Sequence, residues 1–160
     1  MKALINQYGW DGEYYIDAIN DDGERLGSSD CQEGKIYLIP QLWAILADVA
    51  DEEQKKKLLA SIERYLETPL GTLVSWPAYH NYISNIGQMT QKPAGVHENG
   101  GVYLHPCCWK LAVDSILGDN EKVQRGLKKI LPFHEEYHLK KCEPYIMCNS
   151  YFNEETGYRN

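Results

Sequence analysis

The sequence predicts an all-α fold of two helical hairpins, joined by long loops and preceded by a short β excursion near the N-terminus. Apolar residues recur at helical spacing in four separate stretches of the chain. In each pair of stretches a mostly apolar helix is followed by one with a charged face, which is typical of a buried inner helix and an amphipathic outer helix. The length of 160 residues and the apolar content of 43% suit a single soluble domain.

The β excursion is expected between residues 10 and 29. The run from Trp10 to Ile19 is rich in aromatic and β-branched residues, which favour a strand. Residues 20–23 are a turn signal, in which Gly23 takes a positive φ. The segment is too short to indicate a separate sheet domain.

The first hairpin is expected from residue 33 to residue 66. Its inner helix should be largely buried, because an apolar stripe runs almost all round it: Ile36, Leu38, Ile39, Leu42, Trp43, Ile45, Leu46, Val49 and Ala50. Asp51 then caps the outer helix, with Gln54 as its capping-box partner. The apolar face of that outer helix consists of Leu58, Leu59, Ile62 and Leu66.

A long segment with little periodicity follows, from residue 68 to residue 101. It is expected to be irregular, apart from a short strand or helical turn near residues 73–76. The hairpin pattern then repeats: an inner helix spans residues 102–117, Gly118 fits its C-cap, and Asp119 or Asn120 fits the next N-cap. Pro132 ends the outer helix, and residues 134–160 are predicted to form loop and short turns.

The stretch from His97 to Pro106 says most about function. It places a carboxylate, an amide, two adjacent glycines, a phenol and two imidazoles directly before an inner helix. Adjacent glycines let another group approach the backbone closely, and polar side chains on such a loop are a common way to build a ligand site. The twelve tyrosines, against two phenylalanines, fit a cleft that stacks on sugars, although ordinary core and rim positions also account for them.

Charge and cysteine content argue against several classes of protein. The net charge of -7 does not suit a nucleic-acid partner, and no apolar run of about 18 residues predicts a membrane span. The first residues lack the apolar core of a signal peptide. The five cysteines form no paired framework, so we expect reduced thiols in a cytoplasmic protein. A metal site from His105, Cys107 and Cys108 is the less favoured alternative.

Each inner helix is preceded by a polar loop that contains glycine. A toroid of helical hairpins is built in this way, with inner helices lining a centre and the loops at one rim forming the site. Two hairpins are too few to close such a ring. The chain is therefore expected to be part of something larger.

Four stretches of the chain match a known family in order and in spacing. They are Asp21–Asp22–Gly23–Glu24 with Gly27–Ser28, Glu33–Gly34–Lys35–Ile36 with Gln41 and Trp43, Gly95 to His105, and Glu143–Pro144–Tyr145 with Asn149. The segment Glu98–Asn99–Gly100–Gly101 followed by His105 is the most specific. On these residues the chain resembles the catalytic helical barrel of glycoside hydrolase family 94, the cellobiose and chitobiose phosphorylases formerly called glycosyltransferase family 36.

The resemblance implies a partial (α/α)6 barrel, in which residues 1–160 are a single piece of the catalytic domain that lacks upstream and downstream parts. It also implies inverting phosphorolysis of a β-linked disaccharide such as cellobiose, which gives a sugar 1-phosphate and a free sugar. The logic is that of an inverting glycosidase with phosphate in the place of water. A carboxylic acid protonates the leaving oxygen while phosphate attacks from the opposite face. No cofactor is implied, since inorganic phosphate is the co-substrate.

The resemblance also implies roles for individual residues. His105 looks like the phosphate ligand, because an imidazole can donate a hydrogen bond and adds charge when protonated. Glu98 looks like the residue that holds hydroxyls of the acceptor sugar. The alternatives are a helix-start histidine satisfied by backbone and a carboxylate that pins the loop. Asn149 stands where related enzymes carry a glutamine near the sugar. Tyr103, Gln41 and Trp43 are further candidates for substrate contact, with packing roles as the favoured alternative.

The sequence departs from the family pattern in three places. The resemblance implies a general acid, an aspartate in a Trp-Asn-Asp type motif, and a phosphate-binding arginine, both expected upstream of the matching stretches, and no Trp-Asn-Asp motif is found. It also implies a phosphate-binding Thr-Gly pair soon after the position of Asn160. We therefore expect that the chain does not catalyse phosphorolysis alone. The alternative is a non-catalytic helical-hairpin protein that binds carbohydrate or a partner. The expected ligands are a disaccharide or oligosaccharide and phosphate, and a homodimer or association with the missing barrel parts is left open.

Overall fold

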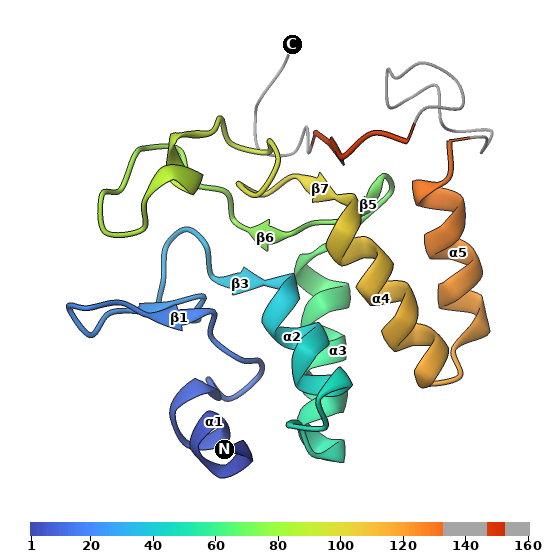
Figure 1. Cartoon of the computed structure of the whole chain (residues 1–160), viewed down its shortest axis with the longest axis horizontal. Helices are drawn as coiled ribbons and strands as arrows, with labels where there is room; N and C mark the ends of the chain where they lie inside the picture. The colour runs from blue at the N-terminus through green and yellow to red at the C-terminus, as the bar shows by residue number, and fades with distance from the viewer. Residues whose placement is uncertain (133–146, 153–160) are drawn as a thin grey trace.

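The computed structural model describes residues 1–132 and 147–152 of the chain (Figure 1). Within these ranges the α-helices are α1 (Lys2–Gly9), α2 (Leu38–Leu46), α3 (Glu52–Tyr65), α4 (Leu104–Ile116) and α5 (Asn120–Ile130), together with a 3-10 helix at Gln88–Gln91. The predicted hairpins are confirmed, since α2 contacts α3 and α4 contacts α5. The two inner helices, α2 and α4, also contact each other, and this contact joins the hairpins side by side.

Short antiparallel strand pairs lie mainly at one end of the helices (Figure 1). They pair β1 (Ala18–Ile19) with β2 (Arg25–Leu26), β3 (Ile36–Tyr37) with β6 (Ser75–Trp76), β4 (Glu67–Thr68) with β5 (Gly71–Thr72), and β7 (Val102–Tyr103) with β8 (Ser150–Tyr151). The predicted β excursion corresponds to β1 and β2, and the predicted strand near residues 73–76 to β6. The all-α prediction is nevertheless only partly confirmed, because strands of two residues are too short to show a period in the sequence.

Both inner helices begin in the same way, each directly after a strand. Residues 36–43 and 102–109 share a pattern: a β-branched apolar residue, then Tyr-Leu, a variable residue, proline, two variable residues and tryptophan. In each case the tyrosine is the N-cap, and its side chain makes no capping hydrogen bond. The repeat places Ile39 and His105 at equivalent positions of the two helices, and Trp43 and Trp109 likewise.

The predicted helix caps are confirmed. The Gln54 amide nitrogen donates to Asp51 Oδ1 at 2.8 Å, and the Asp51 amide nitrogen donates to Gln54 Oε1 at 2.9 Å, which completes the capping box. Asp119 caps α5 by accepting a hydrogen bond from the Lys122 amide at 3.0 Å. Between the hairpin helices Gly118 takes a φ of +76°, as a C-cap glycine does.

The N-terminal helix α1 was not predicted from the sequence. It has no buried residue, so it lacks a packed apolar face. Asn6 fastens it to the first hairpin, because Asn6 Nδ2 donates to the Val49 carbonyl at 3.1 Å while Asn6 Oδ1 accepts from Tyr15 Oη and from Gln54 Nε2. The helix α1 is therefore held by one polar side chain and not by a packed apolar face, which is the feature that predicts a helix from sequence.

The core lies between the hairpin helices and beneath the strands. Its fully buried members include Leu38 and Leu42 of α2, Leu58 and Ile62 of α3, and Val113 of α4. The prediction that the first inner helix is largely buried is wrong on one side, where Trp43 is 47% exposed and Ile39 is also exposed. The reason is that α3 and α4 cover two sides of α2, and the side that carries Trp43 faces outward.

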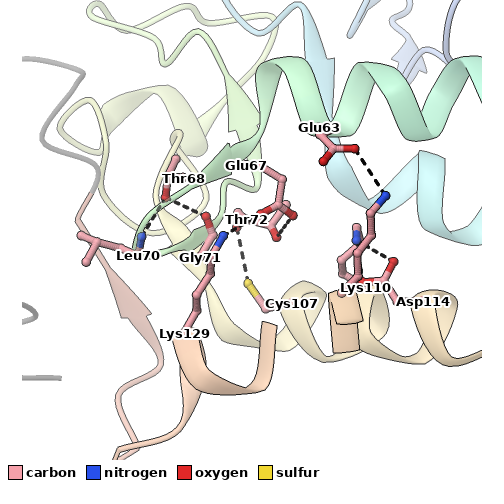
Figure 2. Close-up of polar contacts among 11 residues, drawn as sticks. Glu63, Glu67, Thr68, Leu70, Gly71, Thr72, Cys107, Lys110, Asp114 and Lys129 are labelled. Atoms are coloured by element: carbon pink, nitrogen blue, oxygen red, sulfur yellow. Dashed lines mark hydrogen bonds and ion pairs between the residues drawn. The ribbon is translucent and has the colours of Figure 1, made fainter. Parts of the chain in front are cut away.

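A network of charged side chains ties the second hairpin to the first (Figure 2). Lys129 of α5 donates to Glu67 of β4 at 2.8 Å, and Glu67 also accepts from Thr72 Oγ1 at 2.8 Å. Lys122 of α5 reaches Glu63 of α3 at 3.3 Å. Within α4 the buried Lys110 ammonium contacts both oxygens of Asp114, at 2.6 and 2.7 Å.

These contacts hold α4 and α5 against α3 and β4, so α4, which carries His105 in its first turn, has a defined place. No helix in residues 1–132 or 147–152 has both the length and the apolar character to cross a membrane.

Candidate functional site

The loop before α4 is held in place by Asn99, whose side chain is fully buried. Asn99 Oδ1 accepts a hydrogen bond from the Tyr79 amide at 2.7 Å, and Asn99 Nδ2 donates to the carbonyls of Tyr79 and Lys92 at 2.8 Å each. A buried amide with all these partners satisfied is a rigid connection between two segments. From the sequence alone Asn99 is one of several polar groups of the loop, and its role in connecting these segments is not predicted.

The adjacent glycines are required because other atoms come close to them. A Cβ on Gly100, whose φ is +78°, would lie 2.7 Å from the Cβ of Ala78. A Cβ on Gly101 would lie 2.8 Å from the backbone nitrogen and oxygen of His97. The predicted close approach is therefore confirmed, and the approaching group is the protein itself. It folds the loop tightly before α4.

Glu98 projects from this loop as a partly exposed carboxylate. It forms an ion pair with Lys92, and the two side chains are 40% and 37% exposed. The hydrogen bond from Lys92 lowers the pKa of Glu98 below its usual range, against the opposing effect of partial burial. The carboxylate is thus ionised at neutral pH and suited to accept hydrogen bonds. Lys92 was not singled out in the sequence, because its partner is known only once the loop has folded.

Tyr103 and Asn149 are brought together by the pairing of β7 with β8. Asn149 Nδ2 donates to Tyr103 Oη at 3.4 Å, and the Asn149 carbonyl accepts from the Leu104 amide at 3.0 Å. Next to them, Ser150 Oγ lies 2.8 Å from Nδ1 of His97. His97, which the sequence predicts only as a surface or loop histidine, is therefore part of the same group of residues as Tyr103 and Asn149. Both candidates lie close to the start of α4.

His105 is the second residue of α4, and it is exposed. Its imidazole lies against the indole of Trp109, one turn later, with the ring centroids 4.3 Å apart. Within the described part of the chain its ring nitrogens make no hydrogen bond or ion pair, so both remain available to a ligand. The first turn of a helix also favours a bound anion, because the helix dipole gives it positive character.

Gln41 does not belong to this group of residues. Its side chain is 0% exposed, and it is bonded at both ends to backbone. Gln41 Oε1 accepts from the Tyr15 amide at 2.8 Å, and Gln41 Nε2 donates to the carbonyls of Tyr15 and Tyr37 at 2.8 and 2.9 Å. The expectation that Gln41 contacts substrate finds no support in this position, whereas the packing alternative does. Its amide fastens the segment around Tyr15 to the start of α2.

Asp11 follows a tryptophan in the sequence, but its surroundings do not suit a proton donor. Its Oδ2 accepts from the Ser29 amide at 2.7 Å and from Ser28 Oγ at 3.1 Å, while its Oδ1 pairs with Arg25 at 2.8 Å. Burial opposes ionisation, but these hydrogen bonds and Arg25 together hold the pKa of Asp11 below its ordinary value. A carboxylate held in the ionised form is a poor proton donor, so Asp11 pins the turn after β2.

The alternative of a metal site at His105, Cys107 and Cys108 is not supported. Cys107 is buried, and its thiol donates to the Thr72 carbonyl at 3.4 Å. Burial raises the pKa of Cys107 to about 11, so the thiol is protonated at neutral pH. His105 and Cys108 are exposed instead. In the described ranges, no three His, Cys, Asp or Glu side chains are placed to hold a metal ion together.

Comparison with known proteins gives a consistent result. Residues 1–157 match the family described as the glycosyl hydrolase 94 superfamily, catalytic domain. A solabiose phosphorylase from Paenibacillus borealis is 37% identical over 155 residues, which are 95% of this chain and 20% of that protein.

Two further relatives are also phosphorylases. A cellobionic acid phosphorylase from Neurospora crassa is 40% identical over 104 residues, which are 65% of this chain and 13% of that protein. An N,N'-diacetylchitobiose phosphorylase from Vibrio proteolyticus is 26% identical over 149 residues, which are 91% of this chain and 19% of that protein. The chain thus spans about a fifth or less of the length of these relatives.

Proposed function

Because the chain belongs to the glycosyl hydrolase 94 family, we propose that it supplies part of the active site of a glycoside phosphorylase. The reaction is the inverting phosphorolysis of a disaccharide to a sugar 1-phosphate and a free sugar. The names of the relatives differ in the disaccharide, among them solabiose, cellobionic acid and N,N'-diacetylchitobiose. We therefore propose the substrate as a class and not as one sugar.

One observation carries the proposal: the loop before α4 and the first turn of α4 carry an ionised carboxylate, a phenol that is bonded to the amide of Asn149, and an unpaired imidazole. In the proposed site Glu98 accepts hydrogen bonds from sugar hydroxyls, with Tyr103 and Asn149 as neighbouring polar contacts. His105 binds inorganic phosphate, which needs hydrogen-bond donors and positive charge around it. Phosphate is already anionic, so this half of the site needs no general base.

The role of His105 can be tested by calorimetric titration of the chain with inorganic phosphate. His105→Ile is a well-matched variant, because Ile39 occupies the equivalent position in the first hairpin. Loss of a charge-assisted hydrogen bond should weaken phosphate binding about tenfold or more. Ser115→Ala is the control, because Ser115 is exposed on α4 and lies away from its first turn. Equal phosphate affinity of the native chain and His105→Ile would refute the role.

The sugar half can be tested with cellobiose and with N,N'-diacetylchitobiose. Glu98→Gln should weaken binding of the accepted sugar about tenfold, because a neutral amide replaces a charged acceptor. Phosphate affinity should stay within about twofold of the native value. A variant that binds both ligands as the native chain does would show that Glu98 only pins its loop through Lys92.

We also propose that the chain alone does not turn over substrate. No Trp-Asn-Asp motif, in which the resemblance places the general acid, occurs in its sequence, and the chain spans about a fifth or less of the length of its relatives. The test is an assay of the pure chain with phosphate and either disaccharide. No sugar 1-phosphate is expected, and its release at any steady rate would contradict the proposal.

A second candidate function is favoured by the outward face of the inner helices. Ile39, Trp43 and Ile116 are exposed large apolar residues on α2 and α4, and exposed apolar surface of this kind commonly contacts a partner. In this case the chain binds carbohydrate or a protein but does not take part in catalysis. A chain that is monomeric in sedimentation experiments and binds neither phosphate nor sugar would favour this candidate.

The proposed compartment is the cytoplasm. Its support is that Cys31, Cys107 and Cys108 are free thiols, which a reducing environment maintains. Labelling of the chain with a thiol reagent directly after cell lysis tests the reduced state.

A further inference from the structure

Three aromatic rings form a continuous row across the two inner helices. The imidazole of His105 lies 4.3 Å from the indole of Trp109, tilted by 58°. The indole of Trp43, on the other inner helix, meets Trp109 edge-to-face at 5.3 Å and 76°. The row therefore runs from α2 to the first turn of α4. It connects the first hairpin to the proposed phosphate ligand of the second.

We propose that Trp109 is a positioning residue that fixes the orientation of the His105 imidazole, and that Trp43 in turn fixes Trp109. This inference rests on the proposed role of His105 in phosphate binding. His105 needs such support because it is exposed and, within the described residues, has no hydrogen bond to hold its ring. A side chain with free rotation loses conformational entropy when it binds a ligand, and a neighbouring ring that restricts it reduces this loss.

The geometry suits this role. His105 and Trp109 are four residues apart on one helix, so their side chains lie on the same face, one turn apart. Edge-to-face and tilted contacts at these separations are favourable for aromatic pairs. Trp43 comes from a different helix, and it therefore restricts Trp109 from the side that α4 itself cannot reach. Trp43 is 47% exposed, so its place in the core does not explain it.

The repeated pattern at the start of both inner helices suggests an alternative role for the two tryptophans. Trp43 and Trp109 occupy equivalent positions of the two inner helices, so both could serve only to join the helices. A purely structural role predicts that the state of the His105 ring is independent of them. A positioning role predicts that the ring responds to both tryptophans, including Trp43, whose recorded ring contact is with Trp109 and not with His105.

The experiment reads the histidine imidazole signals of the labelled chain by NMR, with the His105 signal assigned from its loss in His105→Ile. Trp109→Leu and Trp43→Leu should both shift and broaden the His105 signal. Trp109→Phe, which keeps a ring at this position, should restore most of the native signal. Tyr8→Leu is the control, because Tyr8 is an exposed aromatic residue of α1. Unchanged methyl signals of Leu58 and Val113 verify that each variant is folded.

Phosphate titration of the same variants gives the second measurement. Phosphate binding should weaken about 2- to 10-fold in Trp109→Leu, less in Trp43→Leu, and little in Trp109→Phe. An unshifted His105 signal in both leucine variants overturns the positioning role, even if His105→Ile abolishes phosphate binding. If the leucine variants shift the signal while His105→Ile binds phosphate normally, the positioning stands and the proposed phosphate role fails.

Discussion

The Ser150 hydroxyl lies 2.8 Å from Nδ1 of His97, so the last described strand is bonded to the loop that carries Glu98. The same strand pairs with β7 directly before α4. Residues far apart in the sequence therefore fix the two ends of the candidate site together: the loop that carries Glu98 and the first turn of α4, which carries His105.

Ser150→Ala should loosen the loop without unfolding the domain. It removes one partly exposed hydrogen bond, so we expect a loss of about 0.5–1 kcal/mol in the free energy of unfolding. Hydrogen exchange of the amides in residues 95–101 should become faster, while exchange in α3 stays unchanged. Ser115→Ala, at an exposed position of α4, is the control. Identical exchange in the loop of both variants would show that the His97 contact does not hold it.

Gly100→Ala should destabilise the chain more than Gly118→Ala. Both glycines have a positive φ, which costs about 1–2 kcal/mol for a residue with a Cβ. At Gly100 the added Cβ would also lie 2.7 Å from Ala78 Cβ, whereas nothing lies within 4 Å at Gly118. We expect about 2–4 kcal/mol for Gly100→Ala and about 1 kcal/mol for Gly118→Ala from urea unfolding. Equal losses would contradict the crowding at Gly100.

Gln41→Leu should act on stability and not on sugar binding. The substitution leaves the Tyr15 amide and the carbonyls of Tyr15 and Tyr37 without their partner. Buried groups without partners cost about 1–3 kcal/mol each, so we expect a total loss of about 3 kcal/mol or more. Gln32→Leu, at an exposed position, should change stability by less than about 0.5 kcal/mol. If folded Gln41→Leu binds phosphate normally but loses sugar binding, the substrate role regains support.

Glu67→Gln should change how stability depends on pH. Burial opposes ionisation of Glu67, but Lys129 and Thr72 outweigh it and lower its pKa in the folded state. The unfolded chain then binds more protons, so the stabilisation by Glu67 is present above about pH 4.3 and is lost as the pH falls through the folded pKa. Glu67→Gln should lower stability at pH 7 by about 1–2 kcal/mol and flatten its acid slope. Glu53→Gln, in the first turn of α3, is the control. If the free energy of unfolding of Glu67→Gln changed with pH in the same way as that of the native chain, the stabilising role of the Glu67 carboxylate would be contradicted.

Short-range features were predictable from the sequence because their causes are local. The capping box of Asp51 and Gln54, the cap at Asp119 and the left-handed Gly118 each depend on residues no more than three positions apart. The helical hairpins follow from periodic apolar residues in the same way. The shared pattern that begins both inner helices was also legible in the sequence, and aligning the chain with itself would have found it.

Long-range features were not predictable in this way. Asn99 and Gln41 are polar residues whose partners lie 20 and 26 positions away, so nothing in the local pattern distinguishes them from ligand-binding amides. The strands of two residues have no detectable period. Trp43 has the spacing of a core residue, but its exposure depends on which sides of α2 the other helices cover. The family-like residues Glu143–Pro144–Tyr145 lie outside the described residues, as do residues 153–160.

The common opening of α2 and α4 has a consequence for how chemistry could arise in this scaffold. The same backbone start occurs twice, and α2 carries isoleucine at position 39 where α4 carries the proposed phosphate ligand, His105. Because the backbone is the same in both helices, the capacity to bind an anion would depend on the side chain at this position. Ile39→His would place an imidazole at the start of α2. The chain would then have two candidate anion-binding side chains, the introduced imidazole and His105.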